Sequence, residues 1–496
     1  MRSIRSLPLS RKTGLLIIGA TFGLSRGIYY WLGVRFNAEP LLHFWQVIDP
    51  ALLRDAPWQS LFYLRTQLPG FNLYLATIMH LFPRHSVAGF HATYLAMGLL
   101  LGICLFLLLD RLGVNRWLAF FIAVIYVISP ITVLYENWLF YEYPLALLFC
   151  VAALFLHRYA SSNDRSDGIA FFTSLAFIAL FRVIYHLVWF GALVALMLYA
   201  IPRCRRRTAL CAAAPATLLC LVYLKSLLLF GLSAPGSDVY GGINLAFLAR
   251  GDLAGGVLAS MVTEKKISPI LLHDFNFEDG ELVQIIPAPP RTGIGILDER
   301  VKSTGRINMD SLWMAAVGRQ LRQDGFVILR SHPSAIFRTV RENIKRYFLP
   351  ADTGWPFGGT PNPNQQVLAP LLKPFDLVVS GKLPAHNYAF VSYLMTLLLL
   401  GFGFRRSSHW VKSIIRKPRR HAGDLTIMFA FANIAYLTSV VVLYDFTDQN
   451  RILFEVFPLF AVLLGSLLVL VMRRSRRSHL SMDRGRVREN SSIPHE

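Results

Sequence analysis

Long apolar segments, separated by clusters of arginine and lysine, are the feature that most limits how this chain can fold. Each segment has about 18–24 mostly apolar residues, enough for a helix to cross a bilayer core of roughly 30 Å at about 1.5 Å per residue. Ten such segments are predicted, at residues 13–33, 86–109, 117–135, 138–157, 168–184, 185–201, 208–230, 386–404, 424–444 and 452–472. The predicted fold class is therefore an all-α polytopic membrane protein with about ten transmembrane helices.

Every second connection between these segments is basic. The basic connections hold 26 of the 50 lysines and arginines, within residues 2–12, 111–116, 158–165, 203–207, 405–420 and 473–488. Because basic loops stay on the cytoplasmic side of a membrane, both termini are predicted to be cytoplasmic, with the chain in the plasma (inner) membrane. The other connections then face outward, and the longest of them are residues 34–85 and 231–385.

Four parts follow from this topology. They are an N-terminal transmembrane module with acidic outer loops at 1–230, a large extracytoplasmic loop region at 231–385, C-terminal transmembrane helices at 386–472 and a basic cytoplasmic tail at 473–496.

The two long outer loops carry patterns of their own. In the first loop, residues 34–85, apolar side chains recur at helical spacing and are interrupted at Pro50 and Pro57. This pattern predicts short amphipathic helices that lie at the membrane surface. The large loop is predicted to be helical over 311–348 and irregular over the proline-rich stretch 349–374.

The positive charge of the chain does not indicate a nucleic-acid partner. The net charge is +21, but the excess lies at helix ends on one side of the predicted membrane, and residues 231–385 hold 16 basic and 14 acidic residues. Hydrophobic residues make up 54% of the chain, as is typical of a membrane protein. The basic rim is suited to membrane lipids with anionic headgroups, so membrane lipids are predicted partners and nucleic acid is not.

The five cysteines also limit the possibilities. They are Cys104, Cys150, Cys204, Cys211 and Cys220, and all fall in predicted spans or at the cytoplasmic rim. Neither a disulfide framework nor a zinc spacing is available from them. The large outer loop must therefore hold itself together by packing or by resting on the membrane.

Acidic residues gather in the two outer loops nearest the N-terminus. Glu39, Asp49 and Asp55 lie in the first loop, where each is either an ordinary surface or helix-start acid or a functional carboxylate. Glu136 and Glu142 lie close together in the short second loop, among tyrosine and tryptophan. They are either part of an aromatic belt whose carboxylates snorkel to water, or groups that hold a sugar hydroxyl or a divalent cation.

Several basic residues lie near the predicted outer ends of spans, against the general trend. These are Arg182, His186, Lys225 and Arg451. Charges within or near a bilayer are costly and often functional. They either snorkel to the interface or gather around a lipid phosphate, which needs paired cations in a dry setting.

The arrangement resembles the GT-C class of integral-membrane glycosyltransferases. The resemblance lies in a cytoplasmic N-terminus, one span, a long acid-bearing first outer loop and a short acidic second loop. The late turn DFTDQNRILFEVFPLFAVLLG, with Arg451 and Pro458, is similar to the entry of a late span in many such proteins. The resemblance covers residues 13–230 and 424–472. The region 231–385 matches the class only in position, as its variable outer region.

The resemblance implies an enzyme that transfers a hexose or pentose from a polyprenyl-phosphate donor, with inversion, to a glycan, lipid or protein acceptor. A first-loop acid would act as the general base, and here Glu39 and Asp49 are the two catalytic candidates. Asp49 is favoured slightly over Glu39, because the aromatic helix around it can exclude water. Such an acid often follows the first span very closely in the class, where this chain has Asn37. Glu136, Glu142, Arg182, His186, Lys225 and Arg451 are the candidate substrate-binding residues.

The residues fit this chemistry independently. Sugar transfer from a lipid phosphate needs a carboxylate to deprotonate the acceptor hydroxyl and cations to stabilise the departing phosphate. With no tight pair of aspartates and no glycine-rich phosphate loop, neither a metal nor a cofactor is predicted. The alternatives are a lipid-linked glycan polymerase or ligase and a polytopic lipid or glycan transporter. A transporter would show charged residues deep in several spans, or two related halves of the chain.

Overall fold

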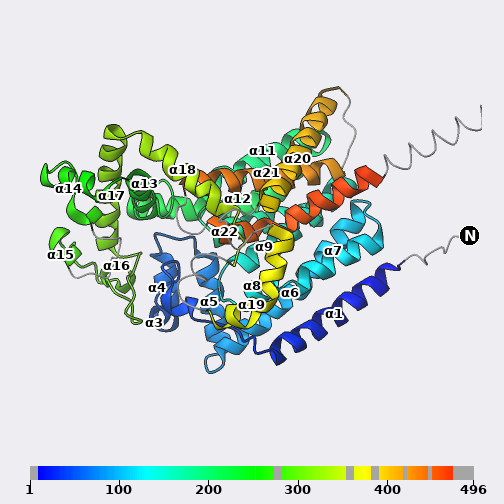
Figure 1. Ribbon diagram of the computed structural model, residues 1–496, viewed down its shortest axis with the longest axis horizontal. Coiled ribbons are helices and arrows are strands. Elements are labelled where there is room, and N and C mark those ends of the chain that lie inside the picture. The colour runs from blue at the N-terminus through cyan, green and yellow to red at the C-terminus, as the bar shows by residue number, and fades with distance from the viewer. Residues whose placement is uncertain are drawn as a thin grey trace, which may run out of the picture.

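The computed structural model describes residues 9–251, 253–272, 281–352, 362–380, 390–416, 422–444 and 449–472. Over these ranges the chain is helical, and its only extended pairings are two isolated bridges. Figure 1 shows long helices running across the molecule, with the N-terminus at one end. The helices within 240–331 gather at the other end; they belong to the loop predicted to face outward, and we call this part the large outer region. The all-α fold class is confirmed.

Five of the described helices are long and apolar enough to cross a membrane. They are α6 (Ser86–Arg111), α9 (Glu142–Ser162), α12 (Arg205–Phe230), α21 (Ala422–Tyr444) and the stretch Asn450–Met472, which includes most of α22 (Gln449–Leu453) and all of η3 (Phe454–Val456). Two bent pairs raise the number to seven if each is one span, namely α7 (Arg116–Ile128) with α8 (Pro130–Glu136), and α13 (Tyr240–Arg250) with α14 (Gly255–Thr263). The chain therefore has the helices of a multi-pass membrane protein, while the count of ten stays a prediction.

The remaining predicted spans correspond to helices that do not meet both requirements. These are α1 (Arg11–Trp31), α10 (Arg165–Phe181), α11 (Leu187–Ala200) and α20 (Phe390–Arg416). Helices α10 and α11 have only 17 and 14 residues. Helices α1 and α20 are long enough, but charged residues such as Arg26 and Arg405 reduce their mean hydropathy.

A proline explains the bend between α7 and α8, which is 55°. Pro130 has no N–H and disfavours a helical conformation at the residue before it. Ser129 accordingly takes an extended conformation, and its hydroxyl accepts a bond from the amide of Thr132 to start α8. The bend directs the end of α8, with Glu136, into the interior.

Short helices fill the first outer loop. They are α2 (Pro40–His43), α3 (Pro50–Asp55), α4 (Pro57–Phe62) and α5 (Pro69–Leu81), and each begins with a proline in its first turn, where the missing N–H costs nothing. The predicted interruptions at Pro50 and Pro57 are thus helix starts. Trp58 and Phe62 of α4 are exposed, as an interfacial helix requires, but their position in a bilayer stays a prediction.

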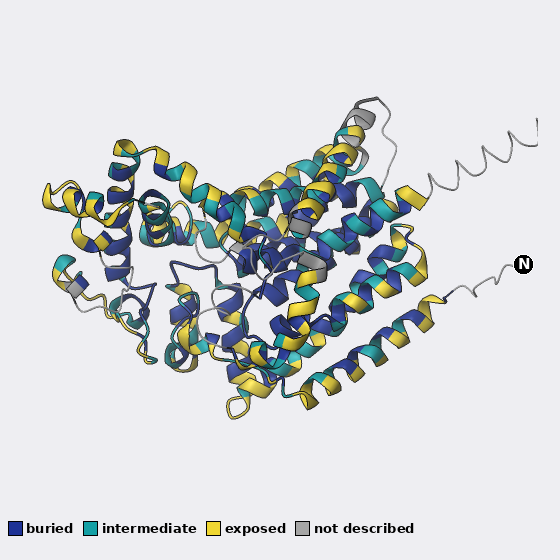
Figure 2. Ribbon diagram, in the orientation of Figure 1, coloured by how far each residue is buried: buried dark blue, intermediate teal, exposed yellow. Residues whose placement is uncertain are grey.

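The large outer region has a hydrophobic core of its own, separate from that of the long helices. Its principal contact is α13 against α17 (Leu312–Ser331), which cross where Gly242 meets Gly318. A Cβ on Gly242 would overlap the backbone of Gly318, so only glycine allows this approach. Smaller elements complete the region, namely η2 (Pro269–Leu272), α15 (Glu281–Ile285), α16 (Gly295–Asp298) and α18 (Ser334–Tyr347). Figure 2 shows the buried faces within it, so packing holds this part together.

One prediction for this part of the chain is wrong. Within 349–374, which was expected to be irregular, the structure has α19 (Pro363–Ser380), packed against α8. Pro363 starts the helix, and Pro370 and Pro374 lie one turn apart on one side of it, so the missing backbone bonds fall on a single face. Residues 353–361 lie outside the described residues.

Buried polar contacts join the large outer region to the first loop. One Asp310 carboxylate oxygen accepts bonds from the Thr66 amide at 2.8 Å, the Thr66 hydroxyl at 2.7 Å and the Arg65 amide at 3.2 Å. The Arg65 guanidinium pairs with Asp238, and Lys302 donates to the carbonyls of residues 44 and 47 at 2.9 and 2.6 Å. We refer to Arg65, Thr66, Asp238, Lys302 and Asp310 as the inter-loop network.

Candidate functional site

Two buried glutamates flank the turn between α8 and α9. Glu136 is the last residue of α8 and Glu142 the first of α9, and both side chains are fully buried. Neither carboxylate reaches the surface, as a snorkelling side chain would. The turn itself is bonded to the first outer loop, because the Asn37 amide donates to the carbonyl of Asn137 at 2.9 Å and the Leu139 amide donates to the carbonyl of Asn37 at 3.0 Å.

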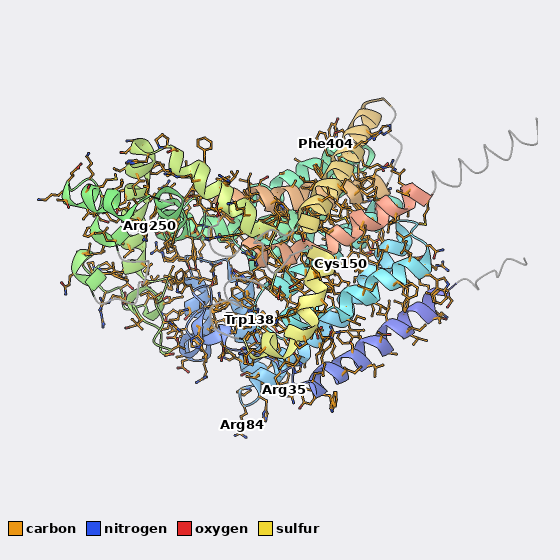
Figure 3. All side chains as sticks on the ribbon, in the orientation of Figure 1. Arg35, Arg84, Trp138, Cys150, Arg250 and Phe404 are labelled. Atoms are coloured by element: carbon orange, nitrogen blue, oxygen red, sulfur yellow. The ribbon has the colours of Figure 1, made fainter. Side chains whose placement is uncertain are left out.

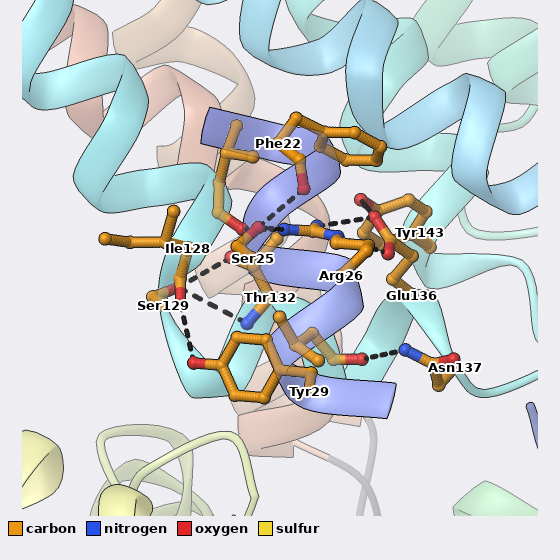
Figure 4. Close-up of polar contacts among 12 residues, drawn as sticks. Phe22, Ser25, Arg26, Tyr29, Ile128, Ser129, Thr132, Glu136, Asn137 and Tyr143 are labelled. Atoms are coloured by element: carbon orange, nitrogen blue, oxygen red, sulfur yellow. Dashed lines mark hydrogen bonds and ion pairs between the residues drawn. The ribbon is translucent and has the colours of Figure 1, made fainter. Parts of the chain in front are cut away.

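Glu136 is held by an arginine of the first helix. Arg26 of α1 donates from Nε and Nη2 to the two carboxylate oxygens, at 2.7 Å each, and the Tyr143 hydroxyl donates to Oε2 at 2.7 Å (Figure 4). Arg26 Nη1 donates to the carbonyl of Val127 at 2.9 Å, so its charge is also satisfied. A Cβ on Gly98 would overlap Glu136 and Tyr143, so glycine at that position of α6 leaves the room for this contact.

A second group of charges lies on the other side of the turn. Arg182, at the end of α10, pairs with Glu455 of η3, whose second oxygen accepts a bond from the Tyr185 hydroxyl at 2.7 Å. Glu142 lies between two arginines, with its Oε1 3.3 Å from Arg451 Nε and 3.8 Å from Arg182 Nη1. All four charged side chains are at least nine-tenths buried.

Aromatic rings enclose these charges. The Arg451 guanidinium carbon lies 4.8 Å from the centre of the Phe140 ring, and that of Arg182 lies 4.9 Å from the Tyr141 ring. The rings of Tyr135 and Phe454 are stacked, with their centres 4.0 Å apart. Because such walls exclude water, each charge interaction inside them is stronger than it would be at the surface.

The six charged residues together form what we call the buried ion cluster, made of Arg26, Glu136, Glu142, Arg182, Arg451 and Glu455. Three positive and three negative side chains balance one another. Glu142 differs from the other two acids, because within the described residues neither of its oxygens accepts a hydrogen bond. It is the carboxylate of the cluster that is held by charge alone.

The predicted site residues are only partly brought together. Glu136, Glu142, Arg182 and Arg451 all belong to the cluster. Lys225, on α12, donates instead to the carbonyl of Leu64 at 2.7 Å. His186 precedes α11, and its side chain makes no capping bond there.

The two predicted catalytic acids lie in different surroundings. The Asp49 carboxylate caps α3 through the Ala51 amide at 2.9 Å and accepts bonds from the amide and hydroxyl of Ser303 at 2.6 and 2.5 Å. Glu39 is exposed at the start of α2, two residues after Asn37, which is bonded to the α8–α9 turn. Its amide is held by the Asn37 side chain at 2.8 Å, so the backbone is fixed while the carboxylate points outward.

Sequence reasoning missed Arg26 and Glu455. Each is a charge inside an otherwise apolar run, which is the signal that identified Arg182 and Arg451. Trp138, labelled in Figure 3, is paired with Asn37 by an isolated bridge, and no local pattern predicted this contact. Over the residues that the structure describes, no three His, Cys, Asp or Glu side chains are grouped to hold a metal ion.

Comparison with known proteins adds nothing to these observations. The chain matches no family model, no curated protein and no solved structure.

Proposed function

We propose that this chain is a membrane glycosyltransferase that moves a sugar from a polyprenyl-phosphate donor to an acceptor outside the cytoplasm, with inversion. The observation that carries the proposal is the junction between the first outer loop and the α8–α9 turn. Backbone bonds at Asn37 hold Glu39 beside a turn whose glutamates lie among buried arginines. Transfer from a phosphate leaving group requires a carboxylate that can reach the acceptor hydroxyl and cations that stabilise the departing phosphate, and the two segments joined at Asn37 carry these groups.

Glu39 is the better candidate for the general base. Asp49 already accepts three hydrogen bonds and fastens the first loop to Ser303, so its removal would disturb structure before chemistry. A base must be able to reach the hydroxyl proton of the acceptor, and the exposed Glu39 carboxylate is free to do so. The order of the two acids is therefore the reverse of what the aromatic surroundings of Asp49 favoured.

Arg182 and Arg451 are the candidates for the donor phosphate. Both lie within 4 Å of one Glu142 carboxylate oxygen, at 3.8 and 3.3 Å, so the two guanidinium groups converge on one anionic position. A phosphate oxygen would compete with Glu142 for the same pair of cations. Lys225 instead binds the carbonyl of Leu64, and we assign neither Lys225 nor His186 a part in donor binding.

The test is sugar transfer by the purified protein in liposomes. A panel of polyprenyl-phosphate hexoses and pentoses, each with a labelled sugar, is offered with a membrane extract as the source of acceptors. Glu39→Gln is expected to lower turnover by about 10²–10⁴-fold, as the loss of a general base does. Glu264→Gln is the matched control, because Glu264 is an exposed acid of the large outer region that forms a surface pair with Lys266.

Two results would contradict the proposal. One is a Glu39→Gln variant that transfers as fast as the Glu264→Gln control. The other is a protein that, although folded, uses none of the donors in the panel.

The proposal also includes the topology. The chain lies in the plasma membrane, with both termini on the cytoplasmic side and the large outer region on the opposite side. This topology is supported by the basic connections and by the separate core of residues 239–328. Alkaline phosphatase fused at residue 300 should be active, and at residue 415 inactive. The reverse pattern would exclude an extracytoplasmic site.

A further inference from the structure

An open cleft of about 790 Å³ lies where the α9–α10 turn meets the start of α12. Its lining residues are Ser162, Asn163, Asp164, Arg165, Cys204, Arg206, Arg207 and Leu210. The cleft is remote from the buried ion cluster, because Glu142 begins α9 whereas Ser162 ends it. A helix of 21 residues is about 30 Å long, so the two sites lie toward opposite ends of the spans.

Three arginines make the cleft positive. Arg207 Nη1 donates to the carbonyl of Asn163 at 2.8 Å and so ties α12 to the turn. Arg165 and Arg206 are exposed, and among the described residues neither guanidinium has a hydrogen bond or an acidic partner. Asp164 also lines the cleft, but its carboxylate accepts bonds from the amide and hydroxyl of Ser166 and caps α10.

The start of α12 adds a favourable field to these charges. The 3-10 helix η1 (Pro202–Cys204) leads directly into this 26-residue helix, and the Cys204 side chain makes no capping bond. The positive end of the helix dipole therefore lies beside the arginines and favours an anion. Two cations without partners and a helix N-terminus together point to the same chemistry, a phosphate group.

The three helices that carry the cleft, α9, α10 and α12, are tightly packed against one another. The Tyr159 hydroxyl and the Thr208 hydroxyl lie 2.8 Å apart, which joins α9 to α12. A Cβ on Gly168 of α10 would lie 2.9 Å from the sulfur of Cys211 and 2.9 Å from the Tyr159 ring, closer than side chains can approach. The three helices thus hold the arginines on a preformed base, so little ordering is needed when an anion binds.

An exposed row of leucines leads from the cleft along α12. Leu210 lines the cleft and is 57% exposed, and Leu221, Leu224 and Leu228 follow on the same side of the helix, all exposed. Only 11% of the most apolar window of α12 is buried. Because α12 is long and apolar enough to cross a membrane, this row is suited to acyl chains.

We propose that the cleft binds the phosphate of an anionic phospholipid whose acyl chains lie along α12. The phosphate contacts Arg165 and Arg206 at the N-terminal end of α12. A soluble phosphate ester could occupy the cleft without contacting the leucine row. A lipid would need the row, because its acyl chains would lie against these leucines. The proposal does not depend on the glycosyltransferase assignment, since the cleft shares no residue with the cluster.

The experiment measures binding of phosphatidylglycerol to the purified full-length protein in detergent, by native mass spectrometry. The double variant Arg165→Ala, Arg206→Ala is expected to bind at least about 10-fold more weakly, because charge-assisted hydrogen bonds are lost. Arg205→Ala is the matched control, since Arg205 is the neighbouring exposed arginine, donates to the carbonyl of Leu198 and does not line the cleft. Its binding should change by less than about twofold.

Further measurements distinguish a lipid phosphate from a soluble phosphate ester. The double variant Leu221→Ser, Leu224→Ser should bind phosphatidylglycerol more weakly, while any binding of glycerol phosphate should be unchanged. Phosphatidylcholine, which has no net charge, should bind weakly to all variants. Equal losses in the Arg205 variant and the cleft variant would overturn the proposal, because the attraction would then be that of a general basic rim. Displacement of the lipid by millimolar glycerol phosphate, with no effect of the leucine changes, would overturn the lipid as the ligand.

Discussion

Charged groups are buried in two places, and they are stabilised in different ways. In the inter-loop network the partners are largely backbone groups, with Asp310 accepting from two amides and Lys302 donating to two carbonyls. In the buried ion cluster the partners are mostly other charged side chains, which come from α1, α8, α9, α10 and the last span.

Under the proposed function, the difference favours the buried ion cluster as the place where a charged ligand is bound. Backbone partners are fixed by the fold, so a network made with them joins segments and cannot easily change. Side chains that balance one another across several helices can exchange partners when a charged ligand enters. Glu142, held by two arginines and by no hydrogen bond among the described residues, is where such an exchange would begin.

The largest effect is expected from breaking a charge pair inside the cluster. Glu455→Ala leaves Arg182 buried without its closest partner, which should reduce the free energy of unfolding by about 3–5 kcal/mol. Chemical denaturation in detergent measures it. Combining Glu455→Leu with Arg182→Met should recover much of the loss, because neither charge then remains unpaired.

A surface pair provides the control for that measurement. Glu264 and Lys266 are 2.6 Å apart and both are exposed, so Glu264→Ala should change the free energy of unfolding by less than about 1 kcal/mol. If Glu455→Ala were as harmless as this control, the cluster would not be the dry, charge-balanced group described above.

A smaller and more local effect is expected from the inter-loop network. Asp310→Ala leaves the Arg65 and Thr66 amides without their acceptor, at a cost of about 1–3 kcal/mol for a buried unsatisfied group. Faster amide hydrogen exchange should follow at Arg65 and Thr66, with the cluster helices unchanged. Asp310→Asn keeps an oxygen acceptor and should show less of this effect. Equal exchange in the two variants would mean that the acceptor is not what joins the loops.

How much the sequence could predict differs between these two regions. Charges near the ends of apolar runs identified Arg182 and Arg451, because a buried charge is costly wherever it occurs. Glu136 and Glu142 were identified as two acids close together among aromatic residues. The partners could not be predicted, since Arg26 and Glu136 are 110 residues apart and only the packing of α1 against α7 brings them together.

Residue type alone predicted the structural effect of prolines well. It predicted the role of acidic residues less well, because an acid can serve several roles. Pro50 and Pro57 do mark the breaks between short helices of the first loop. Asp49 was favoured as a base for its aromatic surroundings, yet its side chain caps α3 and binds Ser303, a residue 254 positions away. A helix-cap role was visible from the Pro50 that follows it, but the contact with the large outer region was not.

The most gradual expected effect is a pH dependence of the inter-loop network, since it builds up as the pH is raised. Burial lowers the pKa of the Lys302 ammonium from 10.5 to about 8, although Asp310 and Asp49 act in the other direction. Between about pH 8 and 10.5 the unfolded chain therefore keeps a proton that the folded chain has lost, so folding stability rises with pH over this window. The slope contributed by one such group is at most about 1.4 kcal/mol per pH unit. Thermal unfolding of the wild type and of Lys302→Met, compared from pH 7 to 10, should show this contribution only in the wild type, and identical profiles would mean that Lys302 does not titrate between the loops.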